Sequence, residues 1–335
     1  MRIAVDAMGG DHAPKAIVHG AVEAARASKG RFEVVLVGDR DQIETELQRH
    51  FNIKQLNISV EHAAETIEMH ESPTTALRRK KNSSIGVAIQ LHKEGKVDAV
   101  VSAGNTGAVM ASSLLGLGRI KGVARPSIGS FLPTPEGVCL LIDVGANVDC
   151  KPQNLLQFAI MGSIFFGRLF DIEKPKVGLL SIGEEESKGN EVTIRTHQIL
   201  KQNSHLNFIG NIEGRDIMQG IVDIAVCDGF VGNIILKFGE SIFHTFSASL
   251  KEKIGKKIHS KIGALLLKSS FRLVKKNYDW EEYGGVPLLG INGVVIICHG
   301  KSSPKAILNA VLEAEKTVEA EVNTYIKREL EFSGE

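Results

Sequence analysis

The chain has few aromatic residues, few cysteines and almost no net charge. Aromatic side chains make up 5% of the 335 residues against a hydrophobic content of 43%, so any core is built from aliphatic side chains. The formal net charge of +1 excludes the broad positive field of a nucleic-acid binder. The four cysteines lie far apart with no CxxC, which argues against a disulfide framework or a zinc site and favours a reducing cytoplasm.

Several targeting and catalytic motifs are also missing. Asp6 interrupts the N-terminus before a signal peptide could form, and no apolar window is long enough to span a bilayer. The sequence contains neither GxxxxGK[ST] nor a well-placed GxGxxG, which disfavours nucleotide binding by the usual loops, and no GxSxG. Cys227 precedes an aspartate at the end of an apolar run, where buried packing is favoured over a role as nucleophile.

Apolar β-branched runs alternate with helical patterns along nearly the whole chain. This alternation predicts βαβ units, and therefore a three-layer α/β/α sandwich with a mainly parallel sheet. The expected strands are 2–6, 32–37, 57–61, 99–102, 138–143, 176–182, 207–212, 224–227 and 294–298. The expected helices are 14–28, 41–50, 106–117, 152–169, 191–201, 231–250 and 304–330.

We expect one catalytic domain over 1–335, with a basic amphipathic helical extension at about 240–284. Residues 251–276 contain nine Lys and Arg against one acid, a local charge of +8, so the rest of the chain sums to −7. Its apolar residues recur at helical spacing between the lysines, and they include Ile258, Ile262, Leu265 and Leu266. A helix of this kind docks on a membrane or an acidic partner, or packs on a neighbouring subunit.

Glycine, asparagine and aspartate cluster where apolar runs stop, as VDAMGGD (5–11), SAGNTGA (102–108), DVGAN (143–147) and CDGFVGN (227–233). In a parallel sheet the carboxyl ends of the strands share one edge, so these clusters suggest a single ligand site. Asn105, Thr106 and Gly107 open a helix whose N-terminal N–H groups are suited to phosphate. The same residues also serve as an ordinary helix cap.

The aspartates of these clusters allow two interpretations. Asp143 and Asp228, with Asp6 and Asp11, supply carboxylates for a magnesium site. The favoured interpretation is that each carboxylate accepts hydrogen bonds from the next turn and fixes its loop, with no metal and no cofactor.

Two further loops carry cations. GEEESKGNE (183–191) contains Lys188, which is suited to neutralising a phosphate or an oxyanion, with the neighbouring acids steering its position. GNIEGRDI (210–217) contains Arg215, a candidate bidentate phosphate ligand. The segment 299–302, which reads HGKS, forms a further strand-to-helix turn suited to an anion.

Taken in order, these motifs resemble the phosphate acyltransferase (PlsX) family of bacterial phospholipid synthesis, and they run from Val5 to Gly300. The resemblance implies transfer of a long-chain acyl group from acyl carrier protein to inorganic phosphate. The product, an acyl phosphate, would serve a membrane acyltransferase that acts on glycerol 3-phosphate. The resemblance also implies a fold similar to that of phosphotransacetylases and isocitrate and isopropylmalate dehydrogenases, and a homodimer peripherally associated with the membrane.

Within this hypothesis bound phosphate attacks the thioester directly, because positioning alone lowers such a barrier substantially. We assign phosphate binding to Asn105, Thr106, Gly107, Asn147, Lys15 and Arg215. The catalytic candidates are Lys188, Asn233, Asp228 and His12. Lys188 opposes the oxyanion, and His12 and Lys15 are second candidates for protonating the thiolate or binding phosphate.

Both acidic carrier protein and anionic lipid would be attracted to the basic segment, including Lys268, and its apolar leucines favour lipid. Three alternatives remain open. They are a phosphotransacylase that uses acyl-CoA, a nicotinamide-dependent dehydrogenase of the related fold, and a non-catalytic membrane scaffold.

Overall fold

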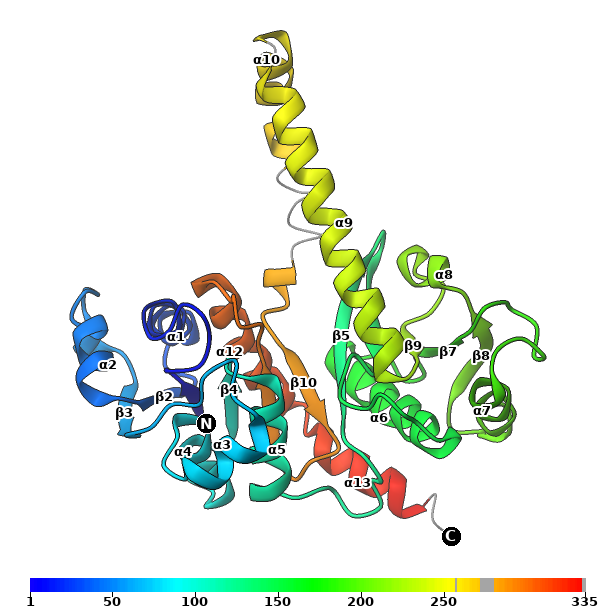
Figure 1. The fold of residues 1–335 in the computed structure, drawn as a ribbon, viewed down its shortest axis with the longest axis horizontal. Coiled ribbons are helices and arrows are strands. Elements are labelled where there is room, and N and C mark those ends of the chain that lie inside the picture. The colour runs from blue at the N-terminus through cyan, green and yellow to red at the C-terminus, as the bar shows by residue number, and fades with distance from the viewer. Residues whose placement is uncertain (257, 272–279, 333–335) are drawn as a thin grey trace.

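The computed structural model describes residues 1–256, 258–271 and 280–332. Its strands are β1 (Arg2–Asp6), β2 (Glu33–Gly38), β3 (Ile58–His62), β4 (Ala99–Ser102), β5 (Ser127–Thr134), β6 (Gly137–Ile142), β7 (Lys176–Leu180), β8 (Asn207–Ile212), β9 (Ile224–Val226), β10 (Val286–Leu289) and β11 (Val294–Ile297). Helices cover both faces of the sheet that these strands form (Figure 1). The predicted α/β/α fold is therefore confirmed.

The α-helices alternate with the strands through most of the chain. They are α1 (Lys15–Ser28), α2 (Arg40–Leu47), α3 (Pro73–Arg79), α4 (Ser84–Lys93), α5 (Thr106–Gly116), α6 (Pro152–Phe170), α7 (Glu191–Gln202), α8 (Gly214–Gln219), α9 (Gly229–Gly255), α10 (Ile258–Leu266), α12 (Pro304–Glu319) and α13 (Val322–Phe332). Short 3-10 turns, η1 (Ile53–Gln55) and η2 (Trp280–Glu282), complete the described elements.

Strand β6 shows how the sequence builds the layers. Successive side chains on a strand point to opposite faces. Leu140 and Ile142 pack with α6 residues such as Phe158, whereas Cys139 and Leu141 pack in the core on the other face of the sheet. All four of these β6 side chains are fully buried, which explains why the strand reads as a continuous apolar run.

The sheet order is β3-β2-β1-β4-β11-β10-β5-β6-β9-β7-β8. Parallel pairs join β3, β2, β1, β4 and β11 into one block, and β6, β9, β7 and β8 into another. Three antiparallel pairings lie between the blocks, so the two blocks run in opposite senses. The expectation that all clusters share one edge of a parallel sheet is therefore wrong.

The error comes from two strands that the sequence pattern did not predict. β5 reads SIGSFLPT, where serine, glycine and proline are typical of a loop, and β10 is a four-residue strand that contains Pro287. Both pair antiparallel with their neighbours. Helices α3, α4 and α8 were also not predicted, and the expected helix 304–330 is two helices that break at Glu321, where φ is +51°.

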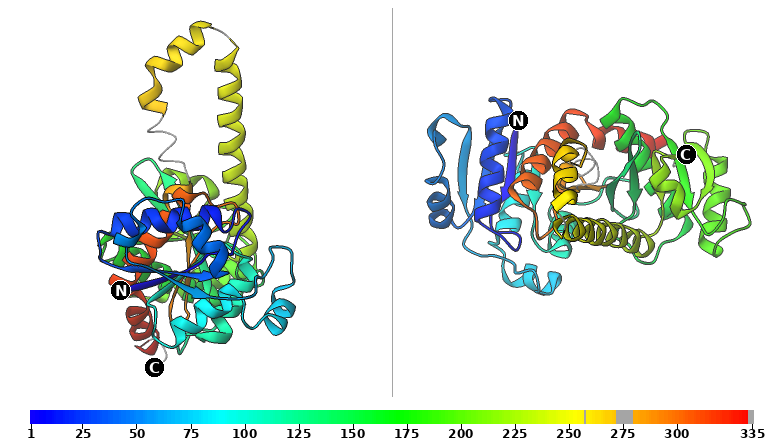
Figure 2. Two further views of the ribbon diagram at one scale, coloured as in Figure 1. Left: turned by 90° about the vertical axis from the view of Figure 1, so that its left-hand side faces the viewer. Right: turned by 90° about the horizontal axis from the view of Figure 1, so that it is seen from above.

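Helix α9 leaves the body of the protein as a stalk with α10 at its far end (Figures 1 and 2). Its first turns are held by Val231, Ile235 and Leu236, which pack against the core. The described helices include none that is both long and apolar enough to cross a membrane. The prediction of one domain over the full chain stays a prediction.

Glu313 on α12 is a buried acid, with 9% of its surface exposed and its Oε1 without a hydrogen-bond partner in the described structure. Burial raises the pKa of this carboxyl from 4.5 to about 7. Because the pKa of Glu313 is higher in the folded protein than in the unfolded chain, the carboxyl stabilises the fold when the pH is below its unfolded pKa. This stabilisation is lost as the pH rises towards 7.

We therefore expect Glu313→Gln to raise the free energy of unfolding at about pH 8 by roughly 2 to 3 kcal/mol, and to change it little near pH 5. Urea unfolding at the two pH values measures this. Glu315→Gln is the matched control, because Glu315 pairs with Arg31 at 2.7 Å and its loss should destabilise the protein. An unchanged pH dependence in Glu313→Gln would contradict the assignment.

Candidate active site

The loops that follow β1, β4 and β11 meet at one edge of the sheet, and we call residues 6–15, 102–107 and 298–303 the first cluster. The Ser102 hydroxyl donates to Asp6 Oδ2 at 2.7 Å, and the Gly104 N–H donates to the Ser102 hydroxyl at 3.1 Å. A Cβ on Gly9 would lie 2.7 Å from the Gly104 nitrogen. Glycine is therefore required for these two loops to approach each other.

The third loop joins through the backbone, where the Asp11 N–H donates to the Gly300 carbonyl at 2.7 Å. Asp6 at the centre is fully buried, and this burial raises the pKa of its carboxyl, opposed by hydrogen bonds from Ser84 and Ser102. The buried carboxyl thus acts as the shared acceptor that holds the loops together.

The side chain of Asn105 hydrogen-bonds to backbone groups of the protein. Its Oδ1 accepts from the Ala108 N–H at 3.1 Å and caps α5, and its Nδ2 donates to the carbonyls of Met69 and Glu71 at 2.9 and 3.1 Å. The side chain that we predicted to bind phosphate therefore ties α5 to the segment before α3.

Gly107 is equally explained by packing, because a Cβ there would lie 2.6 Å from the Pro73 ring. Thr106, His12 and Lys15 are exposed, and their side chains make no hydrogen bond or ion pair in the described part of the chain. Of the predicted residues in the first cluster, these three are available to a ligand.

The loops after β6, β9 and β7 form a second cluster, which comprises residues 143–150, 227–234 and 181–190. Asp143 accepts hydrogen bonds from the N–H groups of Ile128, Ala146 and Asn147 at 3.1, 3.1 and 2.7 Å. The Asn147 amide also donates to Asp143 and to the Pro126 carbonyl. Burial raises the pKa of Asp143, and the Asn147 side-chain hydrogen bond opposes this.

Helix α9 begins against this loop. Asp228 caps it by accepting a hydrogen bond from the N–H three residues on at 2.9 Å, and the Gly229 N–H donates to the Asn147 carbonyl at 2.7 Å. At Gly232 any side chain would collide with the Asp143 carbonyl. Asp143, Asn147 and Asp228 thus hold the backbone in place, as the loop-fixing interpretation predicts.

Asn233 and Lys188 differ from these committed residues. Asn233 lies beside Gly145, whose added Cβ would be 3.7 Å from the Asn233 Cβ, and its amide makes no hydrogen bond to any residue that the structure describes. Lys188 is exposed, its side chain runs past Gly183, and within the described ranges its ammonium has no ion pair. Both can donate to an anion.

The acids near Lys188 face other cations. Glu186 pairs with Lys201 at 2.6 Å, and Glu184 lies 3.6 Å from Arg215, which is within reach of two further carboxylates. Among the described residues no ion pair joins these acids to the Lys188 ammonium, so their steering of Lys188 stays a prediction. The positive charge of Arg215 is largely offset by the three carboxylates near it.

Two residues that the sequence analysis missed anchor the Lys188 loop. The Asn211 amide donates to the Glu185 carbonyl at 2.9 Å, and its Oδ1 lies 2.9 Å from Nδ1 of His197, which is buried. An asparagine in a strand and a histidine in a helix give no local signal of this contact, because 14 residues separate them.

The two clusters lie apart in the sheet. Strands β10 and β5 separate β11, which precedes a loop of the first cluster, from β6, which precedes a loop of the second, and the two blocks run in opposite senses, so the clusters follow opposite strand ends. No hydrogen bond among the described residues joins Asn105 or Thr106 to Asn147 or Asn233. In the part of the chain that the structure describes, no three His, Cys, Asp or Glu side chains gather as metal ligands would.

Cys227, at the start of one loop of the second cluster, is fully buried, and burial raises the pKa of its thiol well above the ordinary value. Its Sγ lies 3.6 Å from the Asp143 carbonyl. The packing role predicted for Cys227 agrees with this environment.

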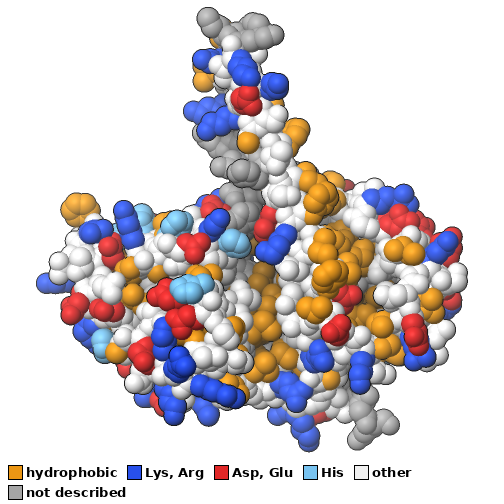
Figure 3. Space-filling model, in the orientation of Figure 1, with side chains coloured by type: hydrophobic (Ala, Val, Ile, Leu, Met, Phe, Trp, Pro, Cys, Tyr) orange, Lys and Arg blue, Asp and Glu red, His pale blue; other side chains and the backbone are white. Residues whose placement is uncertain are grey.

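On the stalk, Ile262, Leu265, Leu266 and Lys268 are exposed, as a docking surface requires. The side chain of Ile258, predicted to join them, lies outside the described residues. Figure 3 shows hydrophobic side chains gathered along α9 as it leaves the body. The stalk therefore presents apolar side chains to solvent along much of its length.

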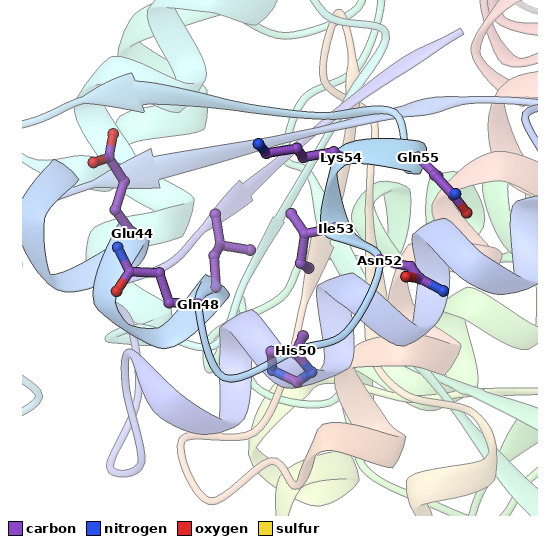
Figure 4. Close-up of a pocket in the computed structure, with 8 residues that line it drawn as sticks. Glu44, Gln48, His50, Asn52, Ile53, Lys54 and Gln55 are labelled. Carbon is purple, nitrogen blue, oxygen red and sulfur yellow. The ribbon is translucent and has the colours of Figure 1, made fainter.

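A hollow of about 630 Å³ lies elsewhere, between α2 and η1 (Figure 4). Its lining includes Glu44, Gln48, His50, Lys54 and Gln55, and none of its residues belongs to either cluster. It is therefore not the candidate site.

Solved structures share this fold. Phosphotransacetylases from Streptococcus pyogenes and Staphylococcus aureus match with TM-scores of 0.60 and 0.59, at 19% and 17% identity, over 96% of this chain and 94% of theirs. A 4-hydroxythreonine-4-phosphate dehydrogenase from Klebsiella pneumoniae matches with a TM-score of 0.54 over 95% of this chain and 99% of its own, at 12% identity. The fold therefore belongs to the class that phosphotransacetylases and these dehydrogenases share, as predicted.

Sequence comparison is more specific. A family model described as "Fatty acid synthesis protein" matches residues 1–325. The phosphate acyltransferase of Pelotomaculum thermopropionicum is 51% identical over 99% of this chain and 95% of its own length. The phosphate acyltransferase of Geotalea daltonii is 50% identical over 99% of this chain and 94% of its own length. The chain belongs to this phosphate acyltransferase family, and the protein is an acyltransferase.

Asp143→Asn should lower the free energy of unfolding by about 2 to 4 kcal/mol, because an amide would turn a donor towards N–H groups that need an acceptor. Urea unfolding measures the loss, and amide hydrogen exchange at Asn147 should accelerate. The control is Asp149→Asn, since Asp149 is exposed in the same loop. Equal behaviour of the two variants would refute the bracing role of Asp143.

Proposed function

We propose that the enzyme transfers an acyl group from acyl carrier protein to inorganic phosphate, which yields acyl phosphate and free carrier protein. Bound phosphate is the nucleophile. One phosphate oxygen forms a bond to the thioester carbon, the C–S bond breaks, and the thiolate leaves with the carrier. The buried, high-pKa thiol of Cys227 supports a reaction without an acyl-enzyme.

The observation that carries this proposal is the pair of uncommitted donors in the second cluster. Asn233 follows β9 and Lys188 follows β7, and these strands are parallel neighbours, so both loops lie at one edge. The ammonium and the amide can bind phosphate and oppose the charge that develops on the carbonyl oxygen. Asp228 positions the N-terminus of α9 beside them.

Phosphate and thioester must meet within contact distance, so one cluster holds both reacting groups. We place them at the second cluster. The first cluster, with Thr106, His12 and Lys15, is the competing phosphate site, and protonation of the thiolate by His12 or Lys15 stays a prediction. At the second cluster Asn147 braces the loop that follows β6, and Arg215 stays a predicted phosphate ligand, while at the first cluster Asn105 and Gly107 form the N-terminus of α5.

The donor and the cellular role extend the proposal. Acyl phosphate is an activated acyl group, which a membrane acyltransferase acting on glycerol 3-phosphate can consume in phospholipid synthesis. The name of the matching family model supports a fatty acyl substrate. The alternative donor is acyl-CoA, and a higher rate with acyl-CoA than with acyl carrier protein at equal concentration would favour it.

We also propose a cytoplasmic homodimer that associates peripherally with anionic membranes. Stalk residues Leu265 and Leu266 are 69% and 79% exposed at the far end of a helical projection. Apolar side chains between lysines insert at a lipid surface while the cations meet anionic headgroups. Phe246, farther along α9 and 65% exposed, is suited to contact with a second copy of the chain.

Lys188→Ala and Asn233→Ala should lower the rate of acyl phosphate formation at limiting phosphate by roughly 10- to 100-fold, because each removes a donor to the reacting anion. Hydroxylamine trapping measures the product. Lys201→Ala is the control, since Lys201 is exposed on α7 but paired with Glu186. If Lys15→Ala and Thr106→Val raise the KM for phosphate while Lys188→Ala does not, the first cluster is the phosphate site.

Leu266→Glu should release the protein from anionic vesicles while solution activity remains, because a charge replaces an inserting side chain. Vesicle co-sedimentation measures binding. Leu115→Glu is a matched control, because Leu115 is also 79% exposed but lies on α5 in the body. Loss of activity with vesicle binding preserved would assign the stalk to carrier protein or to subunit contact.

A further inference from the structure

Four large apolar side chains stand exposed around the second cluster. Val148 is 58% exposed, Ile182 80%, Phe230 58% and Ile234 52%. We call these four residues the apolar collar. Single exposed apolar residues are ordinary on protein surfaces, but several on the loops of one polar site are typical of a ligand-binding surface.

The sheet places the collar at one edge. Val148 follows β6, Phe230 and Ile234 lie in the first turns of α9 after β9, and Ile182 follows β7. The strands β6, β9 and β7 are parallel neighbours in that order, so the loops that carry the collar are adjacent. Figure 3 shows hydrophobic side chains gathered where α9 meets the body.

The collar also lies next to the free polar donors. Ile234 is the neighbour of Asn233 in the chain, and Ile182 opens the loop that carries Lys188. A cation and an amide on loops that also expose apolar side chains match one kind of ligand, an amphiphile with an anionic head and an apolar chain. An acyl phosphate has this chemistry.

We propose that the apolar collar binds the acyl chain of the substrate, while the head of the acyl phosphate lies at Asn233 and Lys188. This inference rests on the proposed function, because it assumes that the acyl group is transferred at the second cluster. The exposed row on α9 continues the collar outward through Phe238 and Ile242. From Phe230 to Ile242 the helix rises about 18 Å, so a long chain can follow it.

The collar then makes affinity depend on chain length. Each methylene group of the ligand that is removed from water can raise the affinity by up to about fourfold. The exposed side chains of the collar supply the apolar surface that covers these methylene groups. A short chain would reach only the collar residues nearest the polar head. We therefore expect the collar to select long acyl chains without contributing to the binding of the head.

Equilibrium binding of butyl and dodecyl phosphonate, below micellar concentrations, tests this without turnover. Wild-type protein should bind dodecyl phosphonate more tightly. Phe230→Ala and Ile182→Ala should weaken dodecyl binding by about tenfold and leave butyl binding within about twofold. Phe51→Ala is the control, because Phe51 is 86% exposed outside both clusters and should change neither affinity.

Undiminished dodecyl affinity in both collar variants, or an equal loss for both phosphonates, would overturn the proposal. A changed molar mass of Phe230→Ala by light scattering would also overturn it, since the side chain would then belong to a subunit contact. The Lys188→Ala variant tests the proposed head site separately from the collar. Unchanged butyl phosphonate affinity in that variant would contradict the proposed head site, while the dependence on chain length would still report on the collar.

Discussion

The loops of the two clusters depend on hydrogen bonds to two buried carboxyl groups, those of Asp6 and Asp143. Asp6 ends β1 and accepts from the Ser102 hydroxyl at the end of β4, and Asp143 follows β6 and accepts from the N–H groups of Ile128 in β5 and of Asn147 in its own loop. Burial raises the pKa of both carboxyls, and the hydrogen bonds from the surrounding donors oppose this effect. These donors satisfy the hydrogen-bonding capacity of each buried carboxyl. Asp143 braces the loop beside Asn233, and Asn211 anchors the loop that carries Lys188, so both donors are presented by braced loops at the second cluster.

The antiparallel strands β5 and β10 set the second constraint. By reversing the chain direction between two parallel blocks, they divide one expected crevice into two clusters. Each cluster has a helix N-terminus and an exposed lysine, Lys15 in the first and Lys188 in the second. Local chemistry therefore does not distinguish them, whereas the apolar collar belongs to the second cluster alone.

The stalk lies outside the body that carries both clusters. Helix α9 begins at the second cluster, held by Asp228 and by core contacts of Val231 and Ile235, and then continues into solvent. One continuous helix therefore links the proposed acyl site to the basic end of the chain's extension. This geometry fits an enzyme whose product has an apolar chain and whose proposed consumer lies in a membrane.

The sequence by itself determined the α/β class, nine of the strands and the family, because apolar periodicity and ordered glycine motifs are local signals. It also located the loops of both clusters. Only the tertiary structure showed that Asn105 and Asn147 are engaged by backbone groups, that Asn211 and His197 brace the Lys188 loop, and that β5 and β10 reverse the sheet. The physical reason is that hydrogen-bond partners and strand directions are set by residues distant in the chain, which no local pattern encodes.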